Sequence, residues 1–81
     1  MAVLTVRYFA SARAAAGVAE ELVAANTVAE ALSTIRERHG ERLGKILDMS
    51  SLLLDGQALH EPYADVAAPA LLDVLPPFAG G

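Results

Sequence analysis

The residues that could take part in chemistry lie at the end of the sequence, where the segment 76–79 is followed by Gly80-Gly81. Glycine has no side chain to pack, and ordering it costs more backbone entropy than ordering any other residue. A glycine pair can, however, pass through a narrow channel and present the carboxylate of Gly81 to another protein's active site. Two glycines at the last two positions arise by chance in roughly 0.5% of sequences. We therefore expect the tail to act through access of its carboxylate to a partner.

The four residues before the glycines are expected to position the tail on that partner. Phe78 is an apolar side chain in a tail segment, which favours an anchor in a partner groove over a place in the core. Pro76 and Pro77 remove two backbone donors and end any strand, and they also stiffen the tail, so that less entropy is lost on docking. Ala79 is assigned to the same partner-binding segment. Residues 76–81 are thus expected to form a tail on a domain of residues 1–75.

The sequence gives little support for a disulfide, a metal site or a cofactor site. The sequence has no cysteine, which excludes disulfides, thiolate metal ligands and a cysteine nucleophile. His39 and His60 have no second ligand at zinc spacing, so we predict no metal site and expect both to be exposed. No glycine-rich phosphate loop is present, and no cofactor is expected to bind this chain.

The charged residues of the first half are expected to be solvated. Glu20 and Glu21 are adjacent in a predicted strand, so their side chains point to opposite faces and cannot form a catalytic dyad. Arg7 and Arg13 could meet acidic groups on a partner, although solvated surface positions are the favoured interpretation. Phe9 is predicted to lie in the core. No residue is predicted to be catalytic.

Charge and hydropathy also limit the partners. A formal charge of −4 and a pI near 4.9 argue against binding to nucleic acid or to an anionic membrane. The first residues lack a basic region followed by an apolar stretch, and no apolar run reaches membrane-spanning length. We expect a cytoplasmic protein.

Strand and helix patterns alternate along the chain. The expected elements are a strand over 3–9, a helical turn over 11–17, a strand over 20–24, a helix that begins at 26–27 and ends at Gly40, a short helix or a structured loop over 41–49, a hairpin over 51–59, a loop over 61–69, and a central strand over 70–75. Thr27 and Glu30 have the spacing of a capping box. Asp55-Gly56 is a tight-turn signal. This order predicts one α+β domain, a roll in which one main helix packs on a mixed sheet.

The sequence resembles a known family over nearly its whole length. An opening strand runs into Phe9-Ala10-x-x-Arg13 and then Gly17, a helix begins Thr27-Val28-x-Glu30-Ala31-Leu32, and the end reads Leu75-Pro76-Pro77 followed by Gly80-Gly81. The combination is similar to the ubiquitin-like β-grasp sulfur carriers, and most closely to the small subunits of molybdopterin synthase. A Pro-Pro pair shortly before Gly-Gly is typical of these carriers.

The resemblance implies a β-grasp fold and a carrier function. An activating enzyme related to the ubiquitin-activating enzymes would use ATP to adenylate Gly81, and sulfur would then replace the leaving group to give a thiocarboxylate. The synthase large subunit would take up the charged tail and transfer the sulfur to a cyclic pterin precursor. Two alternatives remain open within the family, a thiamine-type sulfur carrier and a ubiquitin-like modifier conjugated to lysines through Gly81. A binding module that does not need the glycines is a third.

Overall fold

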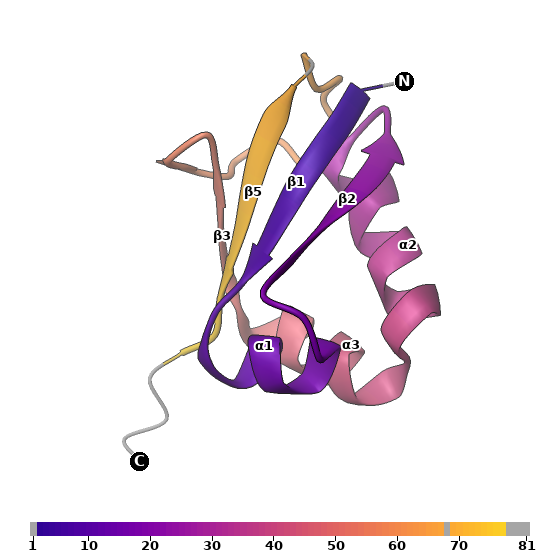
Figure 1. Ribbon diagram of the computed structural model, residues 1–81. Helices are drawn as coiled ribbons and strands as arrows, with labels where there is room; N and C mark the ends of the chain where they lie inside the picture. The colour runs from indigo at the N-terminus through magenta and orange to yellow at the C-terminus, as the bar shows by residue number, and fades with distance from the viewer. Residues whose placement is uncertain (1, 68, 78–81) are drawn as a thin grey trace.

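The computed structural model describes residues 2–67 and 69–77, and it shows the predicted order of elements (Figure 1). The elements are β1 (Ala2–Tyr8), α1 (Ala10–Ala16), β2 (Glu20–Ala25), α2 (Val28–His39), α3 (Glu41–Met49), β3 (Ser51–Leu54), β4 (Gln57–Ala58) and β5 (Ala70–Leu75). The segment 41–49, which the sequence left open between a helix and a loop, is a helix. None of the helices described is long and apolar enough to cross a membrane.

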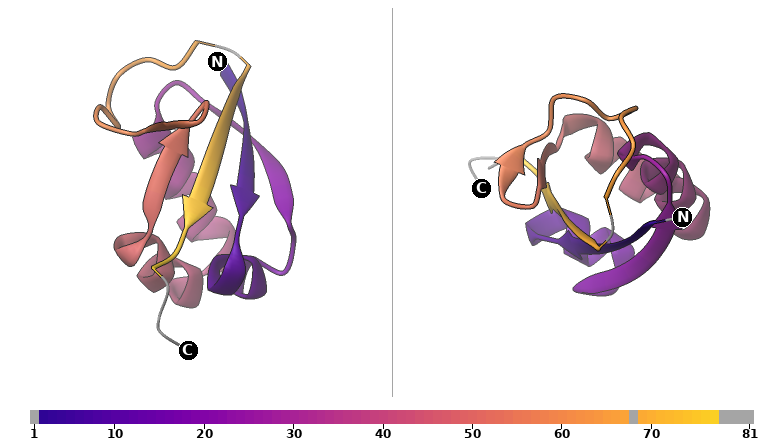
Figure 2. Two further views of the ribbon diagram at one scale, coloured as in Figure 1. Left: turned by 90° about the vertical axis from the view of Figure 1, so that its left-hand side faces the viewer. Right: turned by 90° about the horizontal axis from the view of Figure 1, so that it is seen from above.

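The strands form one mixed sheet in the order β2-β1-β5-β3-β4. β1 runs parallel to β5, and the other neighbouring pairs are antiparallel. β5 therefore lies in the middle of the sheet, as its apolar sequence predicts. The sheet curves around the helices, which cover one face and leave the other open (Figure 2). The predicted α+β roll is confirmed.

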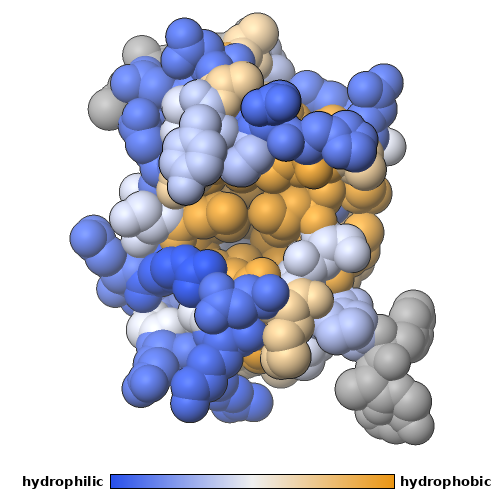
Figure 3. All heavy atoms as spheres, turned by 180° about the vertical axis from the view of Figure 1, so that it is seen from behind, coloured by the Kyte–Doolittle hydropathy of each residue, from blue (hydrophilic) through white to orange (hydrophobic). Residues whose placement is uncertain are grey.

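The core forms between the inner face of the sheet and the helices. Strand alternation places Leu4, Val6 and Tyr8 of β1 on the inner face, where all three are buried. Helix α2 adds Val28, Ala31 and Ile35, whose spacing forms one apolar stripe. Half-buried apolar side chains pack around this centre: Ala15, Ala16, Leu32, Ile46, Leu52, Leu54, Leu59 and Val66. Seen from behind, apolar side chains are visible between two polar margins (Figure 3).

Two glycines shape the helical layer. The Thr27 hydroxyl caps α2 by accepting from the Glu30 N–H at 3.1 Å, and Gly40 ends the helix with φ 85° and ψ −167°. Helix α3 continues through Gly44, although glycine weakens a helix. The Arg36 side chain lies against Gly44 and donates to its carbonyl oxygen at 3.1 Å, so the missing Cβ makes room for this contact.

The hairpin between β3 and β4 turns at Asp55 and Gly56, which both have positive φ, as a type I′ turn requires. The Asp55 carboxylate accepts from the Leu71 N–H at 2.9 Å, and the Asp55 N–H donates to the Leu71 carbonyl at 2.8 Å. The turn predicted from the sequence is therefore confirmed, and it is fastened to the central strand.

Candidate functional site

The predicted tail, residues 76–81, begins directly after β5, and we call this point the tail exit. The strand ends at Leu75, directly before Pro76 and Pro77, in agreement with their predicted role as strand terminators. Pro76 is half-buried and Pro77 is exposed. The predictions for Phe78, Ala79, Gly80 and Gly81 concern residues outside those that the structure describes.

The exit of the tail lies beside the end of β1, because β1 and β5 are parallel neighbours. The Phe9 N–H donates to the Val74 carbonyl at 3.2 Å, and the next residue, Ala10, has a positive φ of 48° as the chain turns into α1. Such a backbone conformation is uncommon outside glycine. At this turn the chain leaves β1 for α1, whereas β5 continues into Pro76 and Pro77.

Phe9 itself is 39% exposed, so the prediction that it lies in the core is wrong. The inner position at this end of β1 is taken by Tyr8, and strand alternation turns the next side chain away from the helices. The Arg7 guanidinium lies 5.7 Å from the centre of the Phe9 ring, within range of a cation–π contact. The exposed ring therefore belongs to the surface beside the tail exit.

Arg7 lies at the surface as expected, with its side chain 43% exposed, but it is also paired within the chain. Arg7 and Asp73 are in register on β1 and β5. The Arg7 Nε and Nη2 atoms donate to the two Asp73 carboxylate oxygens at 2.6 and 2.9 Å. This hydrogen bonding raises the pKa of Arg7 against the opposing effect of desolvation, and the charges of Asp73 and Glu20 add to it. Arg13 is exposed on α1, as expected.

The side chains that point away from the helices form a surface that we call the outer face. Its members are Val3, Thr5 and Arg7 of β1, Glu20, Leu22 and Ala24 of β2, Leu71, Asp73 and Leu75 of β5, Ser51 and Leu53 of β3, and Ala58 of β4. Most of them are apolar, and Leu22 is 64% exposed. One charged pair, Arg7–Asp73, lies in the middle. An apolar sheet face of this kind is suited to contact with another protein, and it extends to the tail exit.

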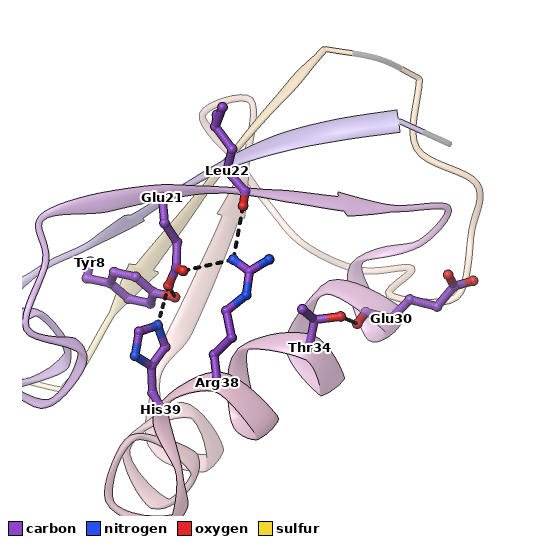
Figure 4. A network of polar contacts seen from close by, with 7 residues as sticks. All are labelled: Tyr8, Glu21, Leu22, Glu30, Thr34, Arg38 and His39. Carbon is purple, nitrogen blue, oxygen red and sulfur yellow. Dashed lines mark hydrogen bonds and ion pairs between the residues drawn. The ribbon is translucent and has the colours of Figure 1, made fainter.

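A second polar cluster lies on the inner side of the sheet, around Glu21 (Figure 4). Its carboxylate accepts from the Tyr8 hydroxyl and from Arg38 Nη1, the latter at 2.9 Å, and it also contacts His39 Nε2. The Tyr8 and His39 rings meet edge to face at 5.9 Å. Arg38 additionally donates to the Leu22 carbonyl at 3.0 Å, which gives a backbone acceptor of edge strand β2 a partner.

The ionisation of this cluster follows from its contacts. Burial alone would raise the pKa of Glu21, but hydrogen bonds from Tyr8, His39 and Arg38 together lower it below the ordinary value. Burial and the bond to Glu21 raise the pKa of Tyr8. Glu21 therefore stays charged and Tyr8 stays protonated at neutral pH. The cluster fastens the end of α2 to β1 and β2, which is a structural role.

The predictions that Glu21 is solvated and that His39 is exposed are both wrong, since each side chain is only 16% exposed. Glu21 alternates with the same period of two as Val23 and Ala25, so all three side chains point inward. This alternation could be seen in the sequence. Glu20 points to the outer face, so the prediction of opposite faces is correct. Within residues 2–67 and 69–77, no three His, Cys, Asp or Glu side chains gather in an arrangement that could hold a metal ion.

Solved structures share this architecture. The chain superimposes on small archaeal modifier protein 1 of Methanosarcina acetivorans with a TM-score of 0.86 and 21% identity, covering 100% of this chain and 98% of that one. For the protein of the same name from Haloferax volcanii the values are 0.83 and 24%, with 98% and 99% covered. A chain in the complex of subunits 1 and 2 of the molybdopterin-converting factor from Helicobacter pylori gives 0.71 and 20%, with 98% and 99% covered.

These likenesses define the class of fold as ubiquitin-like β-grasp, over nearly the full length of each chain. At sequence level, the chain matches no protein-family profile and no curated protein. The predicted fold class is therefore confirmed by three-dimensional likeness.

Proposed function

We propose that this protein is a sulfur carrier, the small subunit of a molybdopterin synthase that carries sulfur as a thiocarboxylate at Gly81. The observation that carries the proposal is the position of the tail exit. The central strand delivers the Pro76-Pro77 segment to the edge of an open apolar face, so that a partner bound there would receive the glycine pair in its active site. Likeness to a chain from a complex of two molybdopterin-converting subunits supports a large-subunit partner.

The chemistry proceeds in three balanced steps. The Gly81 carboxylate attacks the α-phosphate of ATP on the activating enzyme, forming an acyl adenylate and releasing pyrophosphate. A donor that supplies sulfur at the oxidation level of sulfide attacks the acyl carbon and displaces AMP, which leaves a thiocarboxylate. On the large subunit the thiocarboxylate sulfur then attacks a carbon of the pterin precursor and displaces an oxygen leaving group. Water hydrolyses the resulting thioester, which leaves the sulfur on the pterin and restores the carboxylate.

The protein's contribution is to carry and to dock. Among the residues that the structure describes, the Glu21 cluster stabilises the fold and the Arg7–Asp73 pair lies on the outer face. We assign the binding of ATP and of the pterin to sites on the two partner enzymes. The activating enzyme, an adenylyltransferase related to the ubiquitin-activating enzymes, and the synthase large subunit supply the catalytic groups. We propose the cytoplasm as the place where the carrier meets both.

A ubiquitin-like modifier is a second candidate, favoured by the likeness to two small archaeal modifier proteins. The same adenylated Gly81 would then form an isopeptide bond with a lysine amine of a target. A thiamine-type carrier would form the same thiocarboxylate and differ only in the acceptor. The three functions share activation of Gly81 and separate at the step that follows.

Transfer in a reconstituted system tests the proposal. The chain is incubated with ATP, a sulfur donor, the activating enzyme, the large subunit and the cyclic pterin precursor, and molybdopterin is measured. Wild-type protein should yield product, and a chain lacking Gly81 should yield none. Phe78→Ser should reduce transfer, whereas Tyr63→Ser, which removes an exposed aromatic side chain from the loop before β5, should not. Lysine conjugates without molybdopterin would favour the modifier.

A further inference from the structure

The charged pair on the outer face has unused hydrogen-bonding capacity. A guanidinium carries five N–H donors in a fixed fork. Two of Arg7's donors, on Nε and Nη2, are taken by Asp73. Within the part of the chain that the structure describes Arg7 makes no further hydrogen bond, although the charge of Glu20, its register partner on β2, acts on it. The Asp73 side chain is only 9% exposed, whereas that of Arg7 is 43% exposed. Asp73 therefore holds the fork in place, while the remaining three donors make no hydrogen bond to the residues that the structure describes.

A partner that receives the tail would cover this pair. Asp73 lies four residues before Pro77, which corresponds to about 13 Å along an extended strand. A standard interface buries about 800 Å² on each partner, equivalent to a disc of about 16 Å radius. A footprint centred on the tail exit therefore includes Arg7 and Asp73, and it removes water from the three free donors.

We propose that Arg7 is a specificity-determining residue for the large subunit, selecting a partner surface that places an oxygen acceptor opposite the guanidinium. This inference rests on the proposed function. A wholly apolar partner surface would leave the fork without acceptors after water is expelled, and an unsatisfied buried donor is unfavourable. A surface with a carboxylate or carbonyl oxygen at this point satisfies it. The apolar members of the outer face supply contact area, and Arg7 discriminates among apolar partners.

Asp73 and Phe9 support the guanidinium of Arg7 from two sides. Both Asp73 oxygens hold the guanidinium in a fixed plane, and the Phe9 ring lies beside it. A bidentate pair fixes direction as well as charge. Lysine at position 7 would keep the charge but could not present the same fork. The free donors therefore point in a defined direction, which is what discrimination between partners requires.

A double substitution distinguishes a role of Arg7 in partner selection from a role limited to its pairing with Asp73. In Arg7→Leu/Asp73→Leu the net charge is unchanged and the outer face becomes more apolar. The matched control is Arg36→Leu/Asp48→Leu, which removes another Arg–Asp pair, joined at 2.7 Å between α2 and α3 on the helical side. The dissociation constant for the large subunit encoded in the same genome is measured by titration calorimetry, and circular dichroism with thermal unfolding verifies the fold of each variant.

We expect the outer-face variant to bind about tenfold more weakly or worse, because the partner's acceptor loses its donor. The control variant should stay within about twofold of wild type. A second variant, Arg7→Asp/Asp73→Arg, keeps an ion pair but moves the cation to β5, and it should also bind more weakly. If Arg7 merely pairs with Asp73, the apolar variant will bind as tightly as wild type or more tightly, and the inference is overturned. Failure of the wild-type chain to bind would instead contradict the proposed function, and this inference with it.

Discussion

At the scale of single residues, Glu21 is the centre of the inner polar cluster, and its charge is held by three donors from two other elements. Glu21→Gln removes the charge that these donors stabilise. We expect it to lower the free energy of unfolding by about 1–3 kcal/mol. Denaturant unfolding at neutral pH measures the loss. Glu37→Gln, at an exposed position on α2, serves as the control and should change stability by less than about 0.5 kcal/mol.

The same residue predicts a pH dependence. The folded state holds the pKa of Glu21 below its ordinary value of 4.5, so the unfolded chain takes up the proton first as the pH falls. The stability contributed by Glu21 is present above pH 4.5 and is lost as the pH falls from there through the lower pKa of the folded state. Thermal unfolding over this acid range should show a steeper loss for wild type than for Glu21→Gln. Parallel curves would contradict the assigned contacts.

The residue scale is also where prediction from the sequence fails most often. Leu4 and Val6 could be placed in the core because a period of two along one strand is a local pattern. Phe9 could have been placed by the same pattern, because the period of two that buries Tyr8 turns the next side chain outward. The partners of Arg7 and His39 could not be predicted, because each lies far away in the sequence. Arg7 meets Asp73 only when β1 and β5 are paired in one register, and His39 meets Glu21 only when α2 packs against β2.

At the scale of elements, the junction between α2 and α3 depends on Gly40. Its φ of 85° and ψ of −167° lie in a region that is essentially restricted to glycine. Gly17 ends α1 with φ 77° and ψ 3°, a left-handed conformation that other residues adopt at moderate cost. A Cβ at either position would meet no atom within 4 Å, so a substitution tests the backbone alone.

We therefore expect Gly40→Ala to destabilise the protein by about 2–3 kcal/mol and Gly17→Ala by about 1 kcal/mol. The two free energies of unfolding, measured side by side in denaturant, provide the comparison. Equal costs, or a larger cost at Gly17, would show that the backbone at the helix junction is not as described. Both glycines were recognisable in the sequence as helix ends, but the sequence could not indicate which of them is the more restrictive.

At the scale of the whole molecule, the fold and the tail are expected to be separable. The buried core of the described residues extends from Ala2 to Val74, and chain ends contribute little unless they are tied down. Deletion of residues 78–81 should therefore change the free energy of unfolding by less than about 0.5 kcal/mol while abolishing sulfur loading. A large loss of stability would mean that the tail is part of the domain.

The sequence predicts the elements of the roll, but it does not predict the outer face that they form together. Local periods and turn signals determine the elements, and their order limits the fold. The outer face arises only from topology, because its central charged pair joins β1 to the last strand of the chain. Its alignment with the tail exit, on which the proposed function depends, follows from the parallel pairing of those two strands.

The most direct test of the account is the intact mass of the protein after incubation with ATP, a sulfur donor and the activating enzyme. We predict a mass increase equal to the replacement of one oxygen by sulfur, and no change in a chain that lacks Gly81. An unchanged mass of the wild-type chain, with an enzyme shown to be active on a known carrier, would contradict the carrier function.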